Sequence, residues 1–268
     1  MAQINPSPEI QIVLPMAGLG TRFTEAGYQT PKPLLPIHGV PMFKIVLGNI
    51  FSDKVSKVVI ITRREWDLTR EIDHLAKSTN TEFHIVEIDY TTDGPASTVM
   101  LAQDFLDPEE PVVVANSDQY VNTKIETFYE KLVTSDAVGC IMTMNDNDPK
   151  WSFVKLDDQG HVSKVREKEV ISNEATVGIY GFKKAQYMIE AINKMREAND
   201  RVNGEFYVAP AYNFLIASGQ AIDAFNTGDV RDVMFGLGIP RDYEFFVGCH
   251  ESKKAAESAV AFFGQING

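Results

Sequence analysis

The first 145 residues alternate short apolar runs with segments in which apolar residues recur every three or four positions. The runs are typical of strands buried on both faces, and the segments between them are typical of amphipathic helices. The pattern predicts strands over 10–14, 57–62, 82–88, 112–115 and 138–144, and helices over 42–50, over 65–77, from 95 and from about 123. This alternation indicates an α/β fold: a Rossmann-like, mostly parallel sheet with helices on both faces.

Beyond residue 145 the pattern changes. Two short strands, over 152–156 and 161–166, flank the turn 157–160 and predict a hairpin. A strand over 174–182, helices over 184–197 and up to about 217, and a final helix over 251–263 follow. We expect a single domain over 1–268, with a first half over 10–145, a second half over 146–250 that contains a smaller β insertion, and a C-terminal helix in 251–268. Residues 1–9 predict a loose polar tail.

The composition narrows the class of protein. The chain has 268 residues, of which 44% are hydrophobic and 23% are charged, as in ordinary globular domains. No apolar run approaches the ~20 residues of a membrane span, and the first residues do not form a signal peptide. Cys140 and Cys249 are isolated, which favours reduced, buried thiols over a disulfide. We therefore expect a cytoplasmic protein with no membrane partner.

The net charge of −12 argues against a nucleic-acid partner, which requires a basic surface. An anionic small-molecule ligand would then need a local positive site on an acidic body. We expect Arg22, Lys32, Lys168 and a bound Mg²⁺ ion to provide it.

The most informative stretch follows the first predicted strand. Gly18 and Gly20 allow a sharp turn and a close approach of the backbone to a ligand, and consecutive amide groups in such a turn bind anions. Arg22 and Lys32 add two positive charges, and the prolines on either side of Lys32 hold it in an extended segment. This combination predicts a triphosphate-binding loop.

Two common phosphate-binding patterns do not match this loop. The Walker sequence would require Gly-Lys-Ser/Thr at its end. The dinucleotide fingerprint would require glycine where Phe23 stands and an acidic residue after the second strand, where Arg63 and Arg64 stand.

Asp118 is the candidate metal ligand. It comes directly after the apolar run 112–115, where an unpaired carboxylate is costly to bury. Mg²⁺ prefers one or two carboxylates together with phosphate and water oxygens. A helix-capping role for Asp118 is the alternative.

The loop 14–22 together with Pro31, Lys32, Pro33 and Leu34 resembles the signature of the sugar-phosphate nucleotidyltransferases, the nucleoside-diphosphate-sugar pyrophosphorylases. The resemblance covers most of the chain. It implies a nucleotide-binding half over 10–145 and an acceptor-binding half over 146–250. It also implies that Arg22 and Lys32 are catalytic, and that the nucleotide is bound by Pro15, Met16, Ala17, Gly18, Gly20, Thr21, Gly94, Ala96 and Ser117.

Later segments also resemble the family, with departures. Residues 91–98 resemble its base-binding segment, with Gly94 and Ala96 in register and Asp93 and Pro95 departing from it. The resemblance assigns acceptor binding to Glu167, Lys168, Thr176, Gly178 and Glu205, although a solvated charge run, a bulged strand and a helix start are the alternatives. Gly236 stands where the family usually has a second metal-binding Asp, so Glu205 or Asp229 would complete the site, or Asp118 would suffice.

The resemblance implies a nucleoside triphosphate and a sugar 1-phosphate as substrates, with Mg²⁺ as cofactor and no general base. Two alternatives stay open. One is a cytidylyltransferase that acts on a non-sugar phosphomonoester such as phosphocholine, and the other is a non-catalytic nucleotide-sensing subunit. The sequence leaves the nucleobase and formation of a homo-oligomer open.

Overall fold

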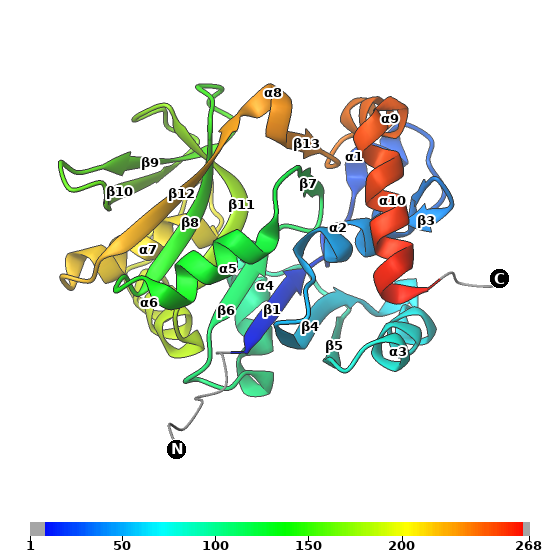
Figure 1. Cartoon of the computed structure of the whole chain (residues 1–268), viewed down its shortest axis with the longest axis horizontal. Coiled ribbons are helices and arrows are strands. Elements are labelled where there is room, and N and C mark those ends of the chain that lie inside the picture. Colours follow the sequence, from blue (N-terminus) through cyan, green and yellow to red (C-terminus); the bar gives the residue numbers. More distant parts are fainter. Residues whose placement is uncertain (1–8, 265–268) are drawn as a thin grey trace, which may run out of the picture.

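The computed structural model describes residues 9–264, so residues 1–8 of the predicted tail 1–9 lie outside the described residues. A nine-stranded sheet runs through the molecule in the order β10-β9-β11-β6-β1-β4-β5, with β8 attached to β11 and β12 attached to β8 (Figure 1). The strands of this sheet are β1 (Ile10–Pro15), β4 (Val55–Arg63), β5 (Glu82–Ile88), β6 (Val112–Ala115), β8 (Gly139–Asn145), β9 (Ser152–Leu156), β10 (Val162–Glu167), β11 (Glu174–Phe182) and β12 (Ile222–Asp229).

The two halves of the sheet differ in strand direction. β1 runs parallel to β4 and β6, and β4 runs parallel to β5. β11 then joins antiparallel to β6, β8 and β9, while β12 returns parallel to β8. The α/β class with a parallel nucleus is confirmed, and the β9–β10 hairpin forms the predicted insertion at the far edge of the sheet.

Helices cover both faces of the sheet. The α-helices are α1 (Thr21–Glu25), α2 (Met42–Ile50), α3 (Thr69–Ser78), α4 (Pro95–Val99), α5 (Ile125–Thr134), α6 (Ala185–Glu197), α7 (Val208–Ala217), α8 (Val230–Val233), α9 (Pro240–Gly248) and α10 (His250–Phe263). The predicted helix over 65–77 is divided, because Asp67 adopts a left-handed conformation between η2 (Arg64–Trp66) and α3. The helix from residue 95 continues after α4 as η3 (Met100–Phe105).

Small elements complete the fold. Two short sheets pair β2 (Pro36–Ile37) with β3 (Val40–Pro41) and β7 (Gln119–Val121) with β13 (Met234–Gly236). A single helical turn, η1 (Lys32–Leu34), carries Lys32, so the expectation of an extended segment at Lys32 is wrong. The sequence pattern did not predict β12, a strand of 8 residues in the large sheet. It also did not predict the smaller elements α1, β2, β3, β7, α8, β13 and α9.

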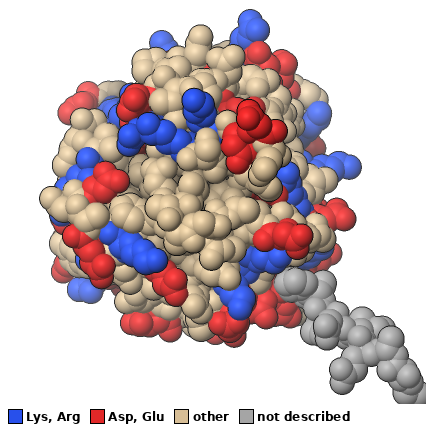
Figure 2. Space-filling model, turned by 90° about the vertical axis from the view of Figure 1, so that its left-hand side faces the viewer, with Lys and Arg blue, Asp and Glu red and all other residues tan. Residues whose placement is uncertain are grey.

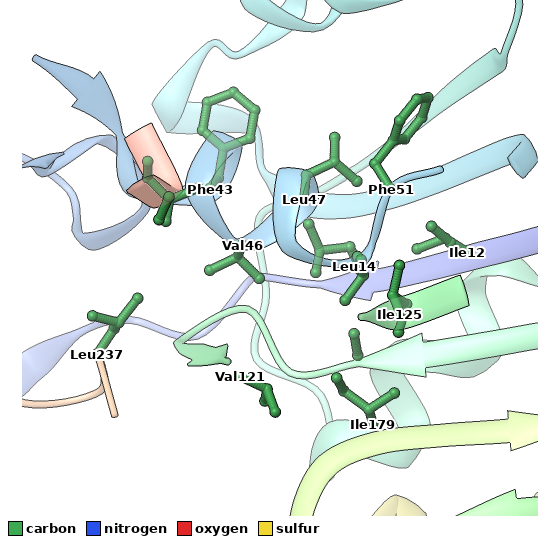
Figure 3. Packing of buried hydrophobic residues seen from close by; sticks show 14 of the residues in the cluster. Ile12, Leu14, Phe43, Val46, Leu47, Phe51, Val121, Ile125, Ile179 and Leu237 are labelled. Carbon is green, nitrogen blue, oxygen red and sulfur yellow. The ribbon is translucent and has the colours of Figure 1, made fainter. Parts of the chain in front are cut away.

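The strands alternate between two hydrophobic clusters, one on each face. Ile12 and Leu14 of β1 join the cluster under α2, α5 and α10, while Val13 between them joins the cluster under α4, α6 and α7. Figure 3 shows the first cluster, in which Phe43, Val46 and Leu47 of α2 pack over β1. Burial of such side chains contributes about 1.5–3 kcal/mol each, and burial on both faces explains why these runs are continuously apolar.

The structure shows how charged residues are distributed on the surface and how deeply the two cysteines are buried. On the face shown in Figure 2, Lys and Arg are interspersed with Asp and Glu. Cys140 is buried and Cys249 is only half-buried, and both are free thiols. Among residues 9–264, no helix is long and apolar enough to cross a membrane.

Candidate active site

A cleft of about 690 Å³ opens at the carboxyl ends of β1 and β6, between the parallel strands and the β9–β11 region. Open α/β sheets bind ligands at this edge. The cleft brings together most of the residues chosen from the sequence: Pro15, Met16, Ala17, Gly18, Arg22, Lys32, Gly94, Ser117, Asp118, Glu167, Lys168, Thr176, Gly178 and Glu205.

A larger hollow of about 1250 Å³ lies at the opposite edge of the sheet, beside the start of β1 and the end of α10. None of the site residues chosen from the sequence lies among those that line it. Size alone therefore does not locate the functional site.

Three of the chosen residues do not line the cleft. Gly20 adopts a left-handed conformation at the start of α1, and a Cβ there would lie 3.3 Å from Lys32 Cβ. Thr21 begins α1 and is exposed. Ala96 is fully buried, and its amide donates to the Phe206 carbonyl at 2.9 Å. In this structure Gly20 allows the approach of Lys32, and Ala96 fastens α4 to the segment before α7.

The nucleotide side of the cleft centres on an ion pair between distant parts of the chain. Lys32 Nζ lies 3.0 Å from Asp118 Oδ2, with the two side chains 13% and 36% exposed. The Lys32 ammonium, with a smaller contribution from Arg22, holds the pKa of Asp118 below its usual value although burial opposes this. Asp118 therefore stays anionic and is matched by cations.

The backbone at Gly178 is crowded by two side chains of the protein. Its φ is +77°, and a Cβ there would lie 2.5 Å from Gln119 Oε1 and would also collide with the Asn116 amide. The Asn116 N–H donates to the Gly178 carbonyl at 2.9 Å. The bare backbone of Gly178 thus accommodates two side chains of the protein. Gly178 also lines the cleft, and its contact with an acceptor stays a prediction.

Gly94 is crowded in the same way. A Cβ there would lie 2.7 Å from the backbone N and O of Phe206 and 2.9 Å from Glu205 Cβ. The segment before α7 requires glycine at this position. Gly94 also lines the cleft, and its contact with a nucleobase stays a prediction.

The acceptor side contains a hydrogen-bonded chain. Lys168 Nζ donates to the Tyr207 hydroxyl at 2.9 Å, and this hydroxyl donates to Glu205 Oε2 at 2.6 Å. Lys168 has a left-handed backbone, with φ of 56°, and its N–H donates to the Trp151 carbonyl at 2.9 Å. A non-glycine residue held this way indicates a position fixed by its surroundings.

Glu167 lies beside this chain, and the Ser152 hydroxyl donates to it. Burial raises the pKa of Glu167, and this hydrogen bond and the nearby Lys168 only partly offset the effect. The carboxyl of Glu167 is therefore more easily protonated than that of Asp118.

The acids considered as a second metal ligand already have hydrogen-bond partners. Asp229 accepts from the Arg231 N–H at the start of α8 at 3.2 Å and does not line the cleft. Glu205 belongs to the Tyr207 chain. The acid that lies next to Gly236 is Asp242, with Oδ2 3.4 Å from the position of a Cβ at 236.

Sequence reasoning missed several residues of the cleft wall: Asn116, Gln119, Ser152, Tyr207 and Asp242. Asn116 and Gln119 flank the chosen Ser117 and Asp118, so the strand end itself was the available signal. Asp242 stands in the first turn of α9, where an acid also favours the helix dipole, and this masked any other role.

The fold and the cleft together define a nucleotidyltransferase-type α/β protein, and comparison with known sequences agrees. Residues 11–209 match the Nucleotidyl transferase family. The chain belongs to this family, which confirms the resemblance inferred from the opening loop.

The individual relatives share about a quarter of their aligned residues with this chain. The Bifunctional protein GlmU of Methanococcus aeolicus is 27% identical over 175 residues, 63% of this chain and 39% of that protein. The CMP-5'-(3-aminopropyl)phosphonate synthase of Streptomyces rubellomurinus is 23% identical over 234 residues, 84% of this chain and 36% of that protein. The chain therefore spans less than half the length of these relatives.

One solved structure superposes on this chain over nearly the whole length of the solved protein. The nucleoside-diphosphate-sugar pyrophosphorylase of Vibrio cholerae RC9 is 27% identical and superposes with a TM-score of 0.75. The match covers 88% of this chain and 99% of that chain.

Proposed function

We propose that this protein transfers a nucleotidyl group from a nucleoside triphosphate to a sugar 1-phosphate. A phosphate oxygen of the acceptor attacks the α-phosphorus and forms the new P–O bond. The bond from the α-phosphorus to the oxygen that bridges it to the β-phosphorus breaks, and pyrophosphate leaves with that electron pair. The acceptor phosphate is already ionised near neutral pH, so the reaction requires no general base.

The arrangement of Arg22, Lys32 and Asp118 carries this proposal. Lys32 reaches the cleft from a loop separate from that of Arg22, and both side chains line the same wall. In the reaction Lys32 would bridge the α-phosphate and the acceptor, and Arg22 would stabilise the departing pyrophosphate. Holding two reactants in line lowers a barrier by roughly 7–11 kcal/mol, and fixed cations stabilise the charge that develops.

Mg²⁺ fits the residues around Asp118. This carboxylate remains anionic, and the neighbouring Gly238 is bare where a Cβ would lie only 2.9 Å from Asp118 Oδ2. A hard oxygen ligand beside open backbone suits a small hydrated cation. Bound there, Mg²⁺ would neutralise charge on the triphosphate.

The acceptor would occupy the other side of the cleft. We assign Glu167 to accept hydrogen bonds from sugar hydroxyls and Lys168 to meet the acceptor phosphate, with Thr176 and Glu205 on the same wall. The nucleotide would lie against 15–18, Gly94 and Ser117. The structure of the pyrophosphorylase from Vibrio cholerae supports a sugar acceptor because it matches this chain through both halves.

The direct test is a substrate panel scored by pyrophosphate release. Purified protein is incubated with Mg²⁺ and each of ATP, CTP, GTP, UTP and dTTP, paired with sugar 1-phosphates. Release that requires both substrates supports the proposal. Nucleotide binding without turnover for any pair would instead make the chain a nucleotide-sensing subunit.

A second candidate is cytidylyl transfer to a non-sugar phosphoester. The relative from Streptomyces rubellomurinus aligns with 84% of this chain. Trp151, Tyr180 and Tyr207 line the acceptor side together with Glu167 and Glu205, and aromatic faces beside carboxylates bind organic cations. Phosphocholine and aminoalkyl phosphonates with CTP therefore belong in the panel, and turnover with these alone would favour this candidate.

A further inference from the structure

Tyr207 links two charged residues on the acceptor side of the cleft. Its hydroxyl accepts a hydrogen bond from Lys168 Nζ at 2.9 Å and donates one to Glu205 Oε2 at 2.6 Å. The Lys168 ammonium also lies over the Tyr207 ring, 4.8 Å from the ring centre. All three side chains line the cleft. The ammonium is therefore held by the hydroxyl and by the ring of a single aromatic side chain.

The packing of α7 against β10 brings these residues together. Tyr207 stands directly before α7, and Lys168 stands directly after β10. Asn213 of α7 fastens the two elements, because its side chain accepts from the Val165 N–H at 2.9 Å and donates to the Val165 carbonyl at 3.0 Å. Figure 1 shows α7 beside the β9–β10 hairpin. The contact between Tyr207 and Lys168 is thus set by the packing of the fold.

Tyr207 is fixed more firmly than the side chain of Lys168. The preceding residue, Phe206, is only 2% exposed. Its N–H donates to the Asp93 carbonyl at 2.8 Å, and its carbonyl accepts from the Ala96 N–H at 2.9 Å. The Lys168 side chain is long and exposed, so without a partner its ammonium would occupy many positions. The Tyr207 hydroxyl is therefore the fixed group, and it restricts the ammonium.

The hydroxyl holds the ammonium without cancelling its charge. Burial raises the pKa of Tyr207, so the hydroxyl keeps its proton and stays neutral. Because this proton is donated to Glu205, the oxygen lone pairs are left to accept from Lys168. The ammonium carries further N–H donors beyond the one that Tyr207 accepts. These donors and the full positive charge stay available for the oxygens of an anionic ligand.

We propose that Tyr207 is a positioning residue for the acceptor: with its hydroxyl oriented by Glu205, it holds the Lys168 ammonium where that ammonium binds an anionic group of the acceptor. The identity of this group as the phosphate of a nucleotidyl acceptor rests on the proposed function, whereas the hold of Tyr207 on Lys168 does not. Tyr207 acts through Lys168, and Glu205 acts through Tyr207.

The first test removes the hydroxyl and keeps the ring. With a triphosphate and acceptor pair that releases pyrophosphate in the substrate panel, Y207F should raise the KM for the acceptor by at least about tenfold, the size expected for loss of a hydrogen bond to a charged group. The kcat and the KM for the triphosphate should change little, whereas damage to the start of α7 would alter all three. The matched control Y187F removes the hydroxyl of a half-buried tyrosine of α6 and should change none of them. An acceptor KM equal to that of wild type in Y207F would overturn the proposal.

A double-mutant cycle shows whether Tyr207 acts through Lys168. K168M removes the ammonium and keeps an apolar stem, so it should raise the acceptor KM more than Y207F does. The double variant Y207F/K168M should have the acceptor KM of K168M, because no ammonium is left to hold. If the two effects multiply instead, Tyr207 acts on the acceptor independently of Lys168, and the proposal is wrong.

A second measurement requires no substrate. Trace acetylation of the native full chain with acetic anhydride, read by peptide mass spectrometry, reports how much free amine each lysine presents. The hydrogen bond to Tyr207 is the main cause that raises the pKa of Lys168, so Lys168 should react more slowly than Lys164, an exposed lysine of β10. In Y207F the ratio of Lys168 to Lys164 labelling should rise several-fold, and in Y187F it should stay as in wild type. An unchanged ratio in Y207F would overturn the hold of Tyr207 on Lys168.

The two measurements separate failure here from failure of the proposed function. If no pair of substrates gives turnover, nucleotidyl transfer falls, and the labelling ratio alone decides whether Tyr207 holds Lys168. If the panel shows turnover while the acceptor KM and the labelling ratio of Y207F match wild type, only the role of Tyr207 falls.

Discussion

The two sides of the cleft both place a lysine beside carboxylates, but they use them differently. Lys32 and Asp118 form a direct ion pair at 3.0 Å, and the pKa of Asp118 is lowered chiefly by the Lys32 ammonium. Lys168 instead bonds to the Tyr207 hydroxyl, and the nearby Glu167 has a pKa raised by burial. The first arrangement holds fixed charge, as phosphates and a metal ion require. The second holds a carboxyl whose pKa is raised by burial beside a lysine and a tyrosine hydroxyl.

The largest effect should come from removing the cation of the ion pair. Lys32→Ala should lower kcat by about 10²–10³, because the loss of one fixed charge-stabilising group has this size. Initial rates of pyrophosphate release measure it. Lys155→Ala, which removes an exposed lysine of β9, is the control. Near-wild-type turnover of Lys32→Ala would remove Lys32 from the catalytic machinery.

Neutralising the carboxylate of Asp118 should weaken metal binding more than nucleotide binding. Asp118→Asn should shift the Mg²⁺ titration of activity by more than about 100-fold, since loss of residues that only support a metal ligand already costs 10–100-fold, while nucleotide binding without metal changes little. Titration calorimetry with and without Mg²⁺ separates the two. An unchanged Mg²⁺ titration would exclude Asp118 from the metal site.

The packing between the two sides of the cleft, where Gly178 of β11 meets Asn116 and Gln119, can be tested by substitution of Gly178. Gly178→Ala should destabilise the fold by about 2–5 kcal/mol, because a collision of the added Cβ with Gln119 and Asn116, worth about 1–3 kcal/mol, adds to the strain of about 1–2 kcal/mol at its positive φ. Gly160→Ala is the control, since Gly160 also has positive φ, +85°, but has no atom within 4 Å of its Cβ position among the described residues. Its cost should be about 1 kcal/mol, from backbone strain alone. Equal losses in the free energy of unfolding, measured by denaturant, would show that the side chains of Asn116 and Gln119 do not crowd Gly178.

The smallest effect is a difference in pH dependence. As pH falls, Glu167 takes up a proton at a higher pH than an ordinary glutamate, because its pKa is raised by burial. The protonated group accepts fewer hydrogen bonds, so the KM for the acceptor should rise a few-fold on the acid side while the KM for the nucleotide stays flat. Glu167→Gln should remove this rise. A rise that persists in Glu167→Gln would place the titrating group elsewhere.

Much of the fold follows from local pattern. The continuous apolar runs of β1, β4 and β6 predicted buried strands, because burial on both faces leaves no polar alternation. Among the elements that were missed, β7 and β13 are short and pair with each other, while β12 is held in the large sheet by its pairing with β8. The sequence also could not divide the helix over 65–77, since the left-handed turn at Asp67 carries no strong signal.

The sequence by itself determined the chemistry of the opening loop. Its features are two glycines, Arg22 and a lysine between prolines. They are neighbours in the sequence, so they can be recognised without knowledge of the fold. Only the tertiary structure decided which groups meet: that Lys32 pairs with Asp118, that Gly94 and Gly178 are bare to accommodate other parts of the protein, and that Asp242 lies above Gly236. Some of these contacts join segments far apart along the chain, and others join residues on either side of a turn. The packing of the sheet and its helices, rather than the neighbouring residues, sets the distances between the groups in contact.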